Sequence, residues 1–191
     1  DSGVQISRQA STQTSMADWP AYNLILDCES WDNYDEPGEN GKGAGENADG
    51  FAAKLSCGPG NVFRGCVSHN NIDDGWDLYT KPAADGYGPI GAVTFDRCIA
   101  YGNGVLTDGT TSSGGDRNGF KLGGSDMENV HYVNRCVAYG NGKNGFTWNS
   151  NPGRIQLVNT LAFDNSVSDG NYKFGASGTP SAAVFRNNVS F

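Results

Sequence analysis

The segment CVAYGN, residues 136–141, carries a pattern that recurs along the whole chain. The pattern is Cys, Thr or Asn, then any residue, Ser or Ala, an aromatic residue or His, any residue, and Asn. The other copies are CESWDN at 28–33, CVSHNN at 66–71, CIAYGN at 98–103, TLAFDN at 160–165 and NVSF at 188–191. In an extended chain the first and third positions point to one side. The pattern therefore predicts a strand that returns in every coil of a repetitive fold.

A second segment alternates with the first and contains a glycine at its second position. Its copies are SGVQIS at 2–7, DGFAAK at 49–54, DGWDLY at 74–79, NGFKLG at 118–123, NGFTWN at 144–149 and DGNYKF at 169–174. The shortest interval between these glycines is 25 residues, and longer intervals contain insertions at 34–47, 80–92 and 104–117. Two or more short strands per coil of this length predict an all-β solenoid of about five coils, occupying residues 1–191 as one domain.

The composition agrees with a fold of strands and turns. The chain has 28 glycines and 20 asparagines, about a quarter of its 191 residues. Both residue types are poor helix formers, which excludes a helical bundle. The last Asn of the first segment is expected to form a ladder of hydrogen bonds from coil to coil. Leucine-rich repeats and propellers are excluded because the segments lack leucine and supply too few strands per repeat.

The repeat assigns structural places to several residues that could be taken for functional ones. His69 shares its position with Trp31 and Tyr101, and Trp76 shares its position with Phe120, so we expect both to stack on their neighbours. Four of the five cysteines share one inward position and are expected to form a buried column of free thiols: Cys28, Cys66, Cys98 and Cys136. The chain has no CxxC pair and no zinc spacing.

The charge balance excludes two classes of partner. The chain has 13 Lys and Arg against 21 Asp and Glu, a formal charge of −8. Binding to nucleic acid or to an anionic membrane is therefore not expected, and no apolar run is long enough to span a bilayer.

Aligning the coils brings four aspartates together at neighbouring positions: Asp49, Asp73, Asp74 and Asp77. No basic residue is interleaved among them in these columns, so their charges need a cation. Oxygen ligands favour a hard ion such as Ca²⁺, whereas zinc would need His or Cys. The alternative is a set of solvated turn aspartates.

Lys121 occupies the Asp77 position in the following coil. Beside a divalent ion its pKa would be lowered, which suits a general base. It could equally neutralise Asp77 in an ordinary salt bridge, and the spacing leaves both interpretations open.

Five stretches of the chain together resemble the family 9 polysaccharide lyases, which are pectate lyases built as right-handed parallel β-helices. They are ENADGFAAKL (46–55), GNVFRGC (60–66), NNIDDGWDLY (70–79), GPIGAVTFDRC (88–98) and NGFKLGG (118–124). The resemblance implies that the four aspartates hold calcium and that Lys121 is the catalytic base. It also implies a secreted enzyme that cleaves α-1,4-polygalacturonate by β-elimination. Arg117 and Lys143, which continue the Asp73 column, are candidates for binding uronate carboxylates, or ordinary surface cations.

Three other functions stay open: a polygalacturonase-type hydrolase, a C5-epimerase, and a non-catalytic solenoid that binds polysaccharide. The family's catalytic domains are longer than this chain. We therefore expect terminal coils or caps to be missing, so that the chain is a segment of a longer domain or is completed by another chain.

Overall fold

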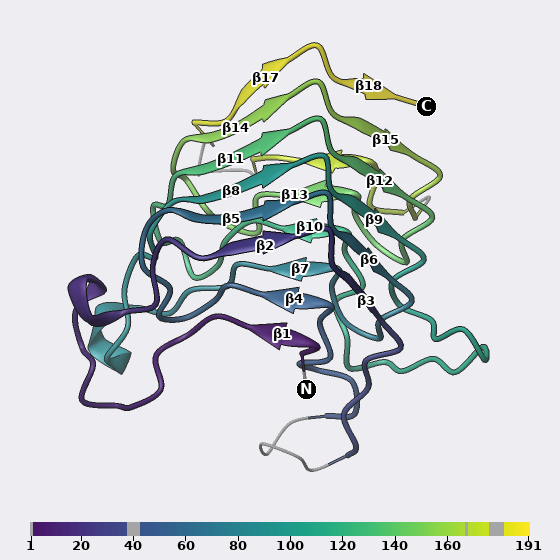
Figure 1. Ribbon diagram of the computed structural model, residues 1–191. Coiled ribbons are helices and arrows are strands. Elements are labelled where there is room, and N and C mark those ends of the chain that lie inside the picture. Colours follow the sequence, from purple (N-terminus) through teal and green to yellow (C-terminus); the bar gives the residue numbers. More distant parts are fainter. Residues whose placement is uncertain (1, 38–42, 167, 176–181) are drawn as a thin grey trace.

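The computed structural model describes residues 2–37, 43–166, 168–175 and 182–191, and the chain winds through three parallel β-sheets (Figure 1). Sheet A contains β1 (Val4–Gln5), β4 (Phe51–Ala52), β7 (Trp76–Asp77), β10 (Phe120–Lys121), β13 (Phe146–Thr147) and β16 (Tyr172–Lys173). Sheet B contains β2 (Leu24–Leu26), β5 (Asn61–Arg64), β8 (Val93–Asp96), β11 (His131–Asn134), β14 (Ile155–Val158) and β17 (Val184–Arg186). Sheet C contains β3 (Glu29–Trp31), β6 (Val67–His69), β9 (Ile99–Tyr101), β12 (Val137–Tyr139), β15 (Leu161–Phe163) and β18 (Val189–Ser190).

Each coil visits the sheets in the order A, B, C, so the two recurring segments of the sequence are the strands of sheets A and C. This confirms the predicted parallel β-helix, with six strands in each sheet of the described chain. The strands of sheet B have no shared motif, only buried apolar side chains at alternate positions such as Phe63 and Phe95. Two short 3₁₀ helices, η1 (Met16–Asp18) and η3 (Ala83–Asp85), lie in loops. No helix in the described ranges is long and apolar enough to cross a membrane.

Stacked aromatic rings and asparagine amides join successive coils. Trp76 stacks on Phe51 and Phe120 with ring centroids 5.1 and 4.6 Å apart, and His69 stacks between Trp31 and Tyr101. The predicted ladder runs from Asn33 through Asn165, with each side-chain amide donating to the next side-chain carbonyl over 2.6–2.9 Å. These contacts confirm the structural roles expected for His69 and Trp76.

The cysteine column is free of disulfides, as predicted, but its predicted burial holds for three of the four members. Cys66, Cys98 and Cys136 are buried, and Cys28 in the first coil is exposed. The Cys136 thiol lies 3.4 Å from the backbone nitrogen of Cys98, which donates to it. The column is therefore a packing feature of the core.

The glycine at the second position of the sheet A segments is explained by the close approach of neighbouring coils. A Cβ added to Gly119 would lie 2.6 Å from the carbonyl oxygen of Gly145 and 2.9 Å from the side-chain nitrogen of Asn141. Only glycine leaves room there for the sheet A strands to pair at normal spacing.

The last coil departs from the predicted alignment by one residue. The sequence motif aligns Gly170 with Gly145, but the strands pair Tyr172 with Phe146 and Lys173 with Thr147. Pairing in this register places the Tyr172 ring 5.3 Å from the Phe146 ring in the aromatic stack. Side-chain stacking thus sets the register here, and the Asp-Gly motif does not.

His131 on β11 provides a test of how the core responds to pH. Its ring is fully buried between Val93 and Ile155, and burial lowers the pKa of His131 to about 3. The unfolded chain binds a proton below about pH 6.5 whereas the folded chain does not, so stability is lost as the pH falls below that value. We expect the folded state to lose about 2 kcal/mol between pH 7 and pH 5 from this group. Urea unfolding of wild type and His131→Val at both pH values measures this change in the free energy of unfolding. An equal decrease in the two proteins would contradict the prediction.

Candidate active site

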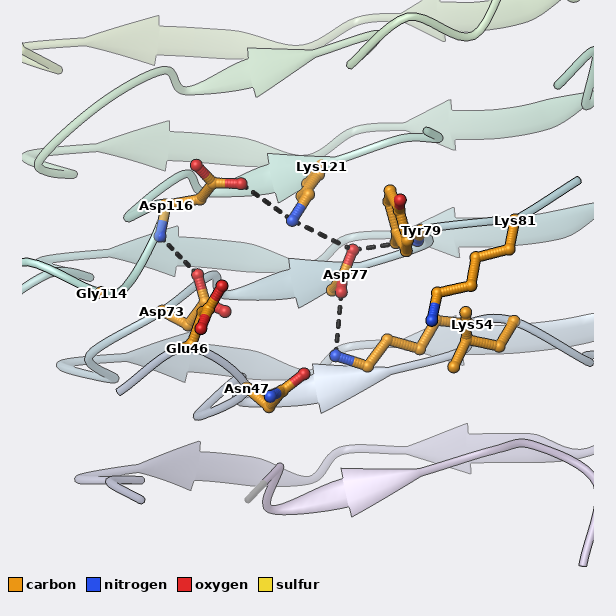
Figure 2. Close-up of a pocket in the computed structure, with 11 residues that line it drawn as sticks. Glu46, Asn47, Lys54, Asp73, Asp77, Tyr79, Lys81, Gly114, Asp116 and Lys121 are labelled. Carbon is orange, nitrogen blue, oxygen red and sulfur yellow. Dashed lines mark hydrogen bonds and ion pairs between the residues drawn. The ribbon is translucent and has the colours of Figure 1, made fainter. Parts of the chain in front are cut away.

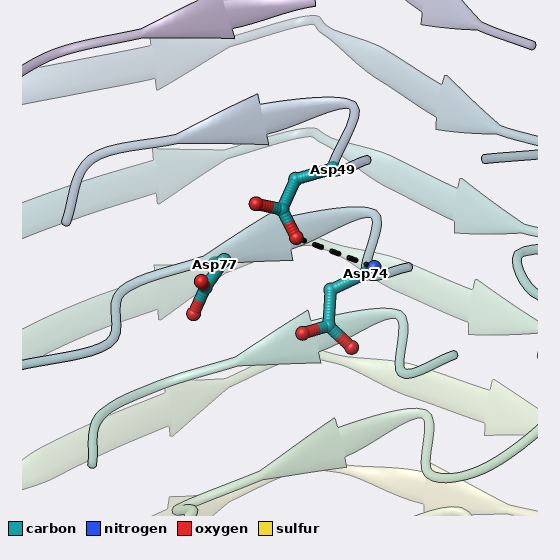
Figure 3. A group of neighbouring side chains, drawn as sticks. All are labelled: Asp49, Asp74 and Asp77. Carbon is teal, nitrogen blue, oxygen red and sulfur yellow. Dashed lines mark hydrogen bonds between the residues drawn. The ribbon is translucent and has the colours of Figure 1, made fainter. Parts of the chain in front are cut away.

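Three of the four predicted aspartates converge on one point beside sheet A (Figure 3). Asp49 and Asp74 each precede the glycine of a sheet A segment, and Asp77 lies on β7. One carboxylate oxygen from each lies within 4.8 Å of the others, and all three side chains are buried. The backbone nitrogen of Asp74 also donates to Asp49 Oδ1 over 3.4 Å. The repeat brings the three together because Asp49 and Asp74 stand one above the other in adjacent coils.

Asp73 lies beside this cluster with a different contact. Its Oδ1 accepts a hydrogen bond of 2.5 Å from the backbone nitrogen of Asp116. Asp73 is therefore tied to the insertion at 104–117, and it lines the pocket described below. The structure brings all four aspartates into one neighbourhood, with Asp73 outside the three-carboxylate group.

Lys54 is the first residue of the site that the sequence interpretation missed. Its ammonium lies 2.6 Å from Asp49 Oδ2 and 2.9 Å from Asp77 Oδ2. The expectation that no basic residue stands among the aspartates was therefore wrong. Alternation offered a signal: Ala52 holds the Asp77 position in the preceding coil, and residue 54 follows on the same side of the chain.

Lys121 extends from β10 toward the same carboxylates (Figure 2). Its Nζ lies 3.1 Å from Asp74 Oδ2 and 3.7 Å from Asp77 Oδ1. A third partner is Asp116 Oδ2 at 3.0 Å, a residue that the sequence interpretation also missed. The ammonium lies 5.6 Å from the centre of the Tyr79 ring. Register explains the placement, because Lys121 pairs directly with Asp77 across β10 and β7.

Arg117 and Lys143 are placed differently from each other. The Lys143 ammonium binds Asp116 Oδ1 at 2.8 Å and so reaches the edge of the site. Arg117 is exposed at a turn with φ of 64° and is not among the residues that line the pocket. The structure therefore joins Lys143 to the cluster through Asp116, and leaves Arg117 outside it.

A cavity of about 290 Å³ opens over these groups (Figure 2). It is lined by Glu46, Asn47, Lys54, Leu55, Asp73, Asp77, Tyr79, Lys81, Gly114, Asp116 and Lys121. Glu46, Lys81 and Asp116 come from the three insertions that interrupt the repeat. The coils thus supply the floor of the pocket, and the insertions supply its walls.

The electrostatics of the cluster are those of a site short of positive charge. Burial raises the pKa of Asp74 to about 7, and burial together with the charge of Asp74 raises the pKa of Asp73 well above its usual value. Burial has the same effect on the pKa of Asp77, but Lys121 and Lys54 outweigh it and lower that pKa. Burial disfavours the charged form of Lys121, yet Asp74 and Asp77 raise its pKa well above the ordinary value.

The donor set fits a hard divalent cation. Six carboxylates and four ammonium groups lie in and around the pocket, which leaves two formal negative charges: Glu46, Asp49, Asp73, Asp74, Asp77 and Asp116 against Lys54, Lys81, Lys121 and Lys143. Asp74 Oδ2 is buried, and the Lys121 ammonium 3.1 Å away is its one partner in the described part of the chain. Three carboxylate oxygens that lie within 4.8 Å of one another are compatible with Ca²⁺, whose oxygen ligands lie at ~2.3–2.6 Å. The predicted lowering of the Lys121 pKa depends on such an ion, since the carboxylates alone raise it.

The sequence of this chain matches the family model described as the Pel9A-like, right handed beta helix region over residues 1–188. The chain belongs to this family. The match agrees with the resemblance that the sequence motifs carry, and it gives the hand of the β-helix as right-handed.

Several known proteins are similar to this chain. Pectate lyase L of Thermoclostridium stercorarium is 55% identical over 166 residues, which cover 87% of this chain and 12% of that protein. Pectate lyase L of Paenibacillus polymyxa (strain SC2) is 47% identical over 191 residues, 100% of this chain and 39% of that protein. The crystal structure of pectate lyase Pel9A superposes with a TM-score of 0.71 at 30% identity, covering 98% of this chain and 45% of that one. The chain therefore spans less than half the length of each of these relatives.

Proposed function

We propose that this chain is the calcium-binding and catalytic part of a pectate lyase, which cleaves α-1,4-polygalacturonate by β-elimination. The observation that carries the proposal is the placement of Lys121, with its Nζ 3.1 Å from Asp74 and 3.0 Å from Asp116 in the pocket above the three-carboxylate group. The pectate lyases to which the chain is similar support the assignment of substrate class.

Asp49, Asp74 and Asp77 would hold the calcium ion, with Asp73 completing the acidic wall of the pocket. When bound, calcium would contact the C6 carboxylate of a galacturonate residue, acidify the C5 proton and stabilise the negative charge that develops there. These aspartates therefore serve to place the substrate carboxylate beside Lys121.

Lys121 acts as the base in its neutral form. Its Nζ accepts the C5 proton, the electron pair of the C5–H bond forms the C4–C5 double bond, and the C4–O4 bond breaks with its electrons on O4. The leaving oxygen takes a proton from water, and Lys121 returns its own proton to solvent. The products are a shortened chain with a saturated reducing end and a chain with a 4,5-unsaturated uronate at its non-reducing end.

Lys143 is the better placed of the two candidate cations for a neighbouring uronate carboxylate. It is about one third exposed and already binds the Asp116 carboxylate at the pocket edge. We expect Lys143→Gln to raise KM by about 5- to 10-fold and to lower kcat less than twofold, because one charge-assisted contact to the substrate is lost. Arg117→Gln is expected to change KM in the same direction by a smaller factor. Steady-state kinetics on polygalacturonate measure both, and an unchanged KM for both variants would contradict the role of these cations.

The rival functions differ in their products. An inverting or retaining glycoside hydrolase needs two carboxyl groups ~5–9.5 Å apart on opposite sides of the bond, whereas these carboxylates cluster within 4.8 Å and face lysines. Mass spectrometry of the products of polygalacturonate distinguishes the cases. A lyase gives a fragment one water lighter than the hydrolysis product, an epimerase leaves chain length unchanged, and a binding protein gives no product.

We expect the protein to act outside the cell, because pectin is a polymer of the plant cell wall.

A further inference from the structure

Three arginines gather around one aspartate at the bend between sheets B and C. The Arg135 guanidinium donates through Nε and Nη2 to Asp96 Oδ1 over 2.9 and 2.6 Å. Arg64 and Arg97 approach Asp96 Oδ2 at 3.5 and 3.6 Å. The Asp96 side chain is 11% exposed, whereas those of the three arginines are 44–58% exposed. The buried carboxylate holds three exposed guanidinium groups together.

This corner concentrates positive charge in an acidic protein. The chain has seven arginines and a formal charge of −8, and a fourth arginine, Arg186, continues the Arg64 row of sheet B at its far end. Each guanidinium has five N–H donors, of which one carboxylate satisfies only a few. Arg97 and Arg135 occupy the turn that follows each sheet B strand. In the first coil this turn position is held by an acidic residue, Asp27, which contacts Gly65 of the next coil. Arg97 and Arg135 are 58% and 52% exposed, so donors that Asp96 does not use are accessible to a ligand.

A groove of about 310 Å³ lies on sheet B, in the coils to which Asp96 and Arg135 belong. It is lined by Thr94, Tyr132, Val133, Asn134, Gln156 and Val158. Tyr132 is 40% exposed, and Asn134 directly precedes Arg135 and pairs in register with Asp96. The groove thus combines an exposed aromatic ring with side-chain amides, one of which, that of Asn134, is adjacent in the chain to an arginine of the cluster.

We propose that this groove and the arginine cluster form a second binding site, for an anionic, uronate-containing polysaccharide, that takes no part in cleavage. The ring of Tyr132 offers an apolar face with a polar edge to a sugar ring. The side-chain amides of Asn134 and Gln156 bind hydroxyl groups. Arg97 and Arg135 bind a carboxylate, for which guanidinium groups have matching two-point geometry.

The second site is on a different face of the β-helix from the pocket. The groove lies on sheet B and the pocket on sheet A, and Figure 1 shows these sheets as separate sides of each coil. A polymer held at one site raises the local concentration of chain segments at the other. The inference goes beyond the proposed lyase activity, because it requires neither calcium nor Lys121.

The repeat itself supplies a conservative substitution for the test. Arg97 and Arg135 occupy the left-handed turn position, with φ of 56° and 55°, and Asn159 and Asn187 occupy the same position in later coils at 55° and 53°. Arg97→Asn and Arg135→Asn therefore keep the turn geometry while removing the guanidinium groups. Arg154, which is exposed just before β14, provides a charge-matched control as Arg154→Asn.

The experiment titrates the chain with hexagalacturonate in the presence of a chelator, so that no cleavage occurs, and follows backbone and side-chain amide signals by NMR. We expect shifts at Asn134, Gln156 and Arg135, an affinity that falls as salt is added, and no binding of neutral maltohexaose. R97N/R135N should weaken hexagalacturonate binding at this face by about tenfold or more, with R154N unchanged.

Tyr132→Thr, which copies the Thr94 side chain of the neighbouring strand, should weaken binding at this face as well. Shifts confined to the sheet A pocket, equal binding of the neutral sugar, or an affinity unaltered in a folded R97N/R135N chain would each overturn the proposal. Because calcium is absent throughout, these outcomes are independent of whether the chain proves to be a lyase.

Discussion

Replacing Lys121 with alanine is expected to lower kcat on polygalacturonate by about 10²–10⁴-fold, the usual contribution of a general base. The substitution removes the only nitrogen that contacts Asp74, Asp77 and Asp116 together in the described part of the chain. Calcium binding should be retained, since an ammonium group that competes for the same carboxylates is gone. The measurement is kcat at saturating substrate and calcium.

Two further variants separate loss of the base from loss of charge. Lys121→Arg keeps a cation beside Asp74 and Asp77, but arginine stays protonated at any working pH, so this variant should be as inactive as the alanine one. Lys173→Ala changes the lysine two coils along the same column, beyond Thr147, and should leave kcat within twofold. Near-normal turnover of Lys121→Ala would show that the base lies elsewhere.

Asp74→Asn is expected to weaken calcium binding by about a hundredfold or more. Asp74 Oδ1 accepts two hydrogen bonds of 2.8 Å from the backbone and side chain of Asn118, so its Oδ2, which faces the Lys121 ammonium at 3.1 Å, is the oxygen that a metal ion would bind. An amide at this position removes a negative charge from the ligand set and puts an N–H donor or a neutral oxygen toward the ion. Calorimetric titration with calcium measures the change directly.

The same variant should also lose stabilisation by calcium. Wild type is expected to gain about 2.7 kcal/mol in free energy of unfolding when calcium is present at a hundred times its Kd, and Asp74→Asn should gain little at that concentration. Asp169→Asn is the matched control, because Asp169 also precedes a glycine but pairs with Lys173 away from the cluster. Equal calcium affinity in wild type and Asp74→Asn would place the metal site elsewhere.

The parts of the structure that the sequence predicted are those that repeat. Trp76, His69 and the asparagine ladder are placed by alternation and by the coil length, because stacking like on like fixes each position relative to its neighbours. The Asp49 and Asp74 pair followed from the same alignment. A charged residue at a position that other coils fill with uncharged residues is easy to recognise in the alignment. The aspartate cluster could therefore be predicted from the sequence alone.

Some of the parts that the sequence did not predict come from segments without a repeat, and two others, Lys54 and Tyr172, lie within repeated segments. Asp116 and Lys81 reach the pocket from insertions whose paths depend on tertiary contacts, such as the bond from Asp116 to Asp73. Lys54 lies just past the end of β4, where its long side chain can turn in several directions, and its ion pairs with the buried Asp49 and Asp77 hold it in one. The Tyr172 register was missed because ring stacking outweighed a glycine motif in the last coil.

The most direct test is a progress curve of near-ultraviolet absorbance, which reports the double bond of an unsaturated uronate, with polygalacturonate as substrate. The absorbance of the reaction is recorded first with calcium, then after addition of excess chelator, then after calcium is restored. We predict that absorbance rises, stops and resumes. Cleavage of the polymer without any rise in absorbance, or a rise that continues in chelator, would contradict a calcium-dependent elimination.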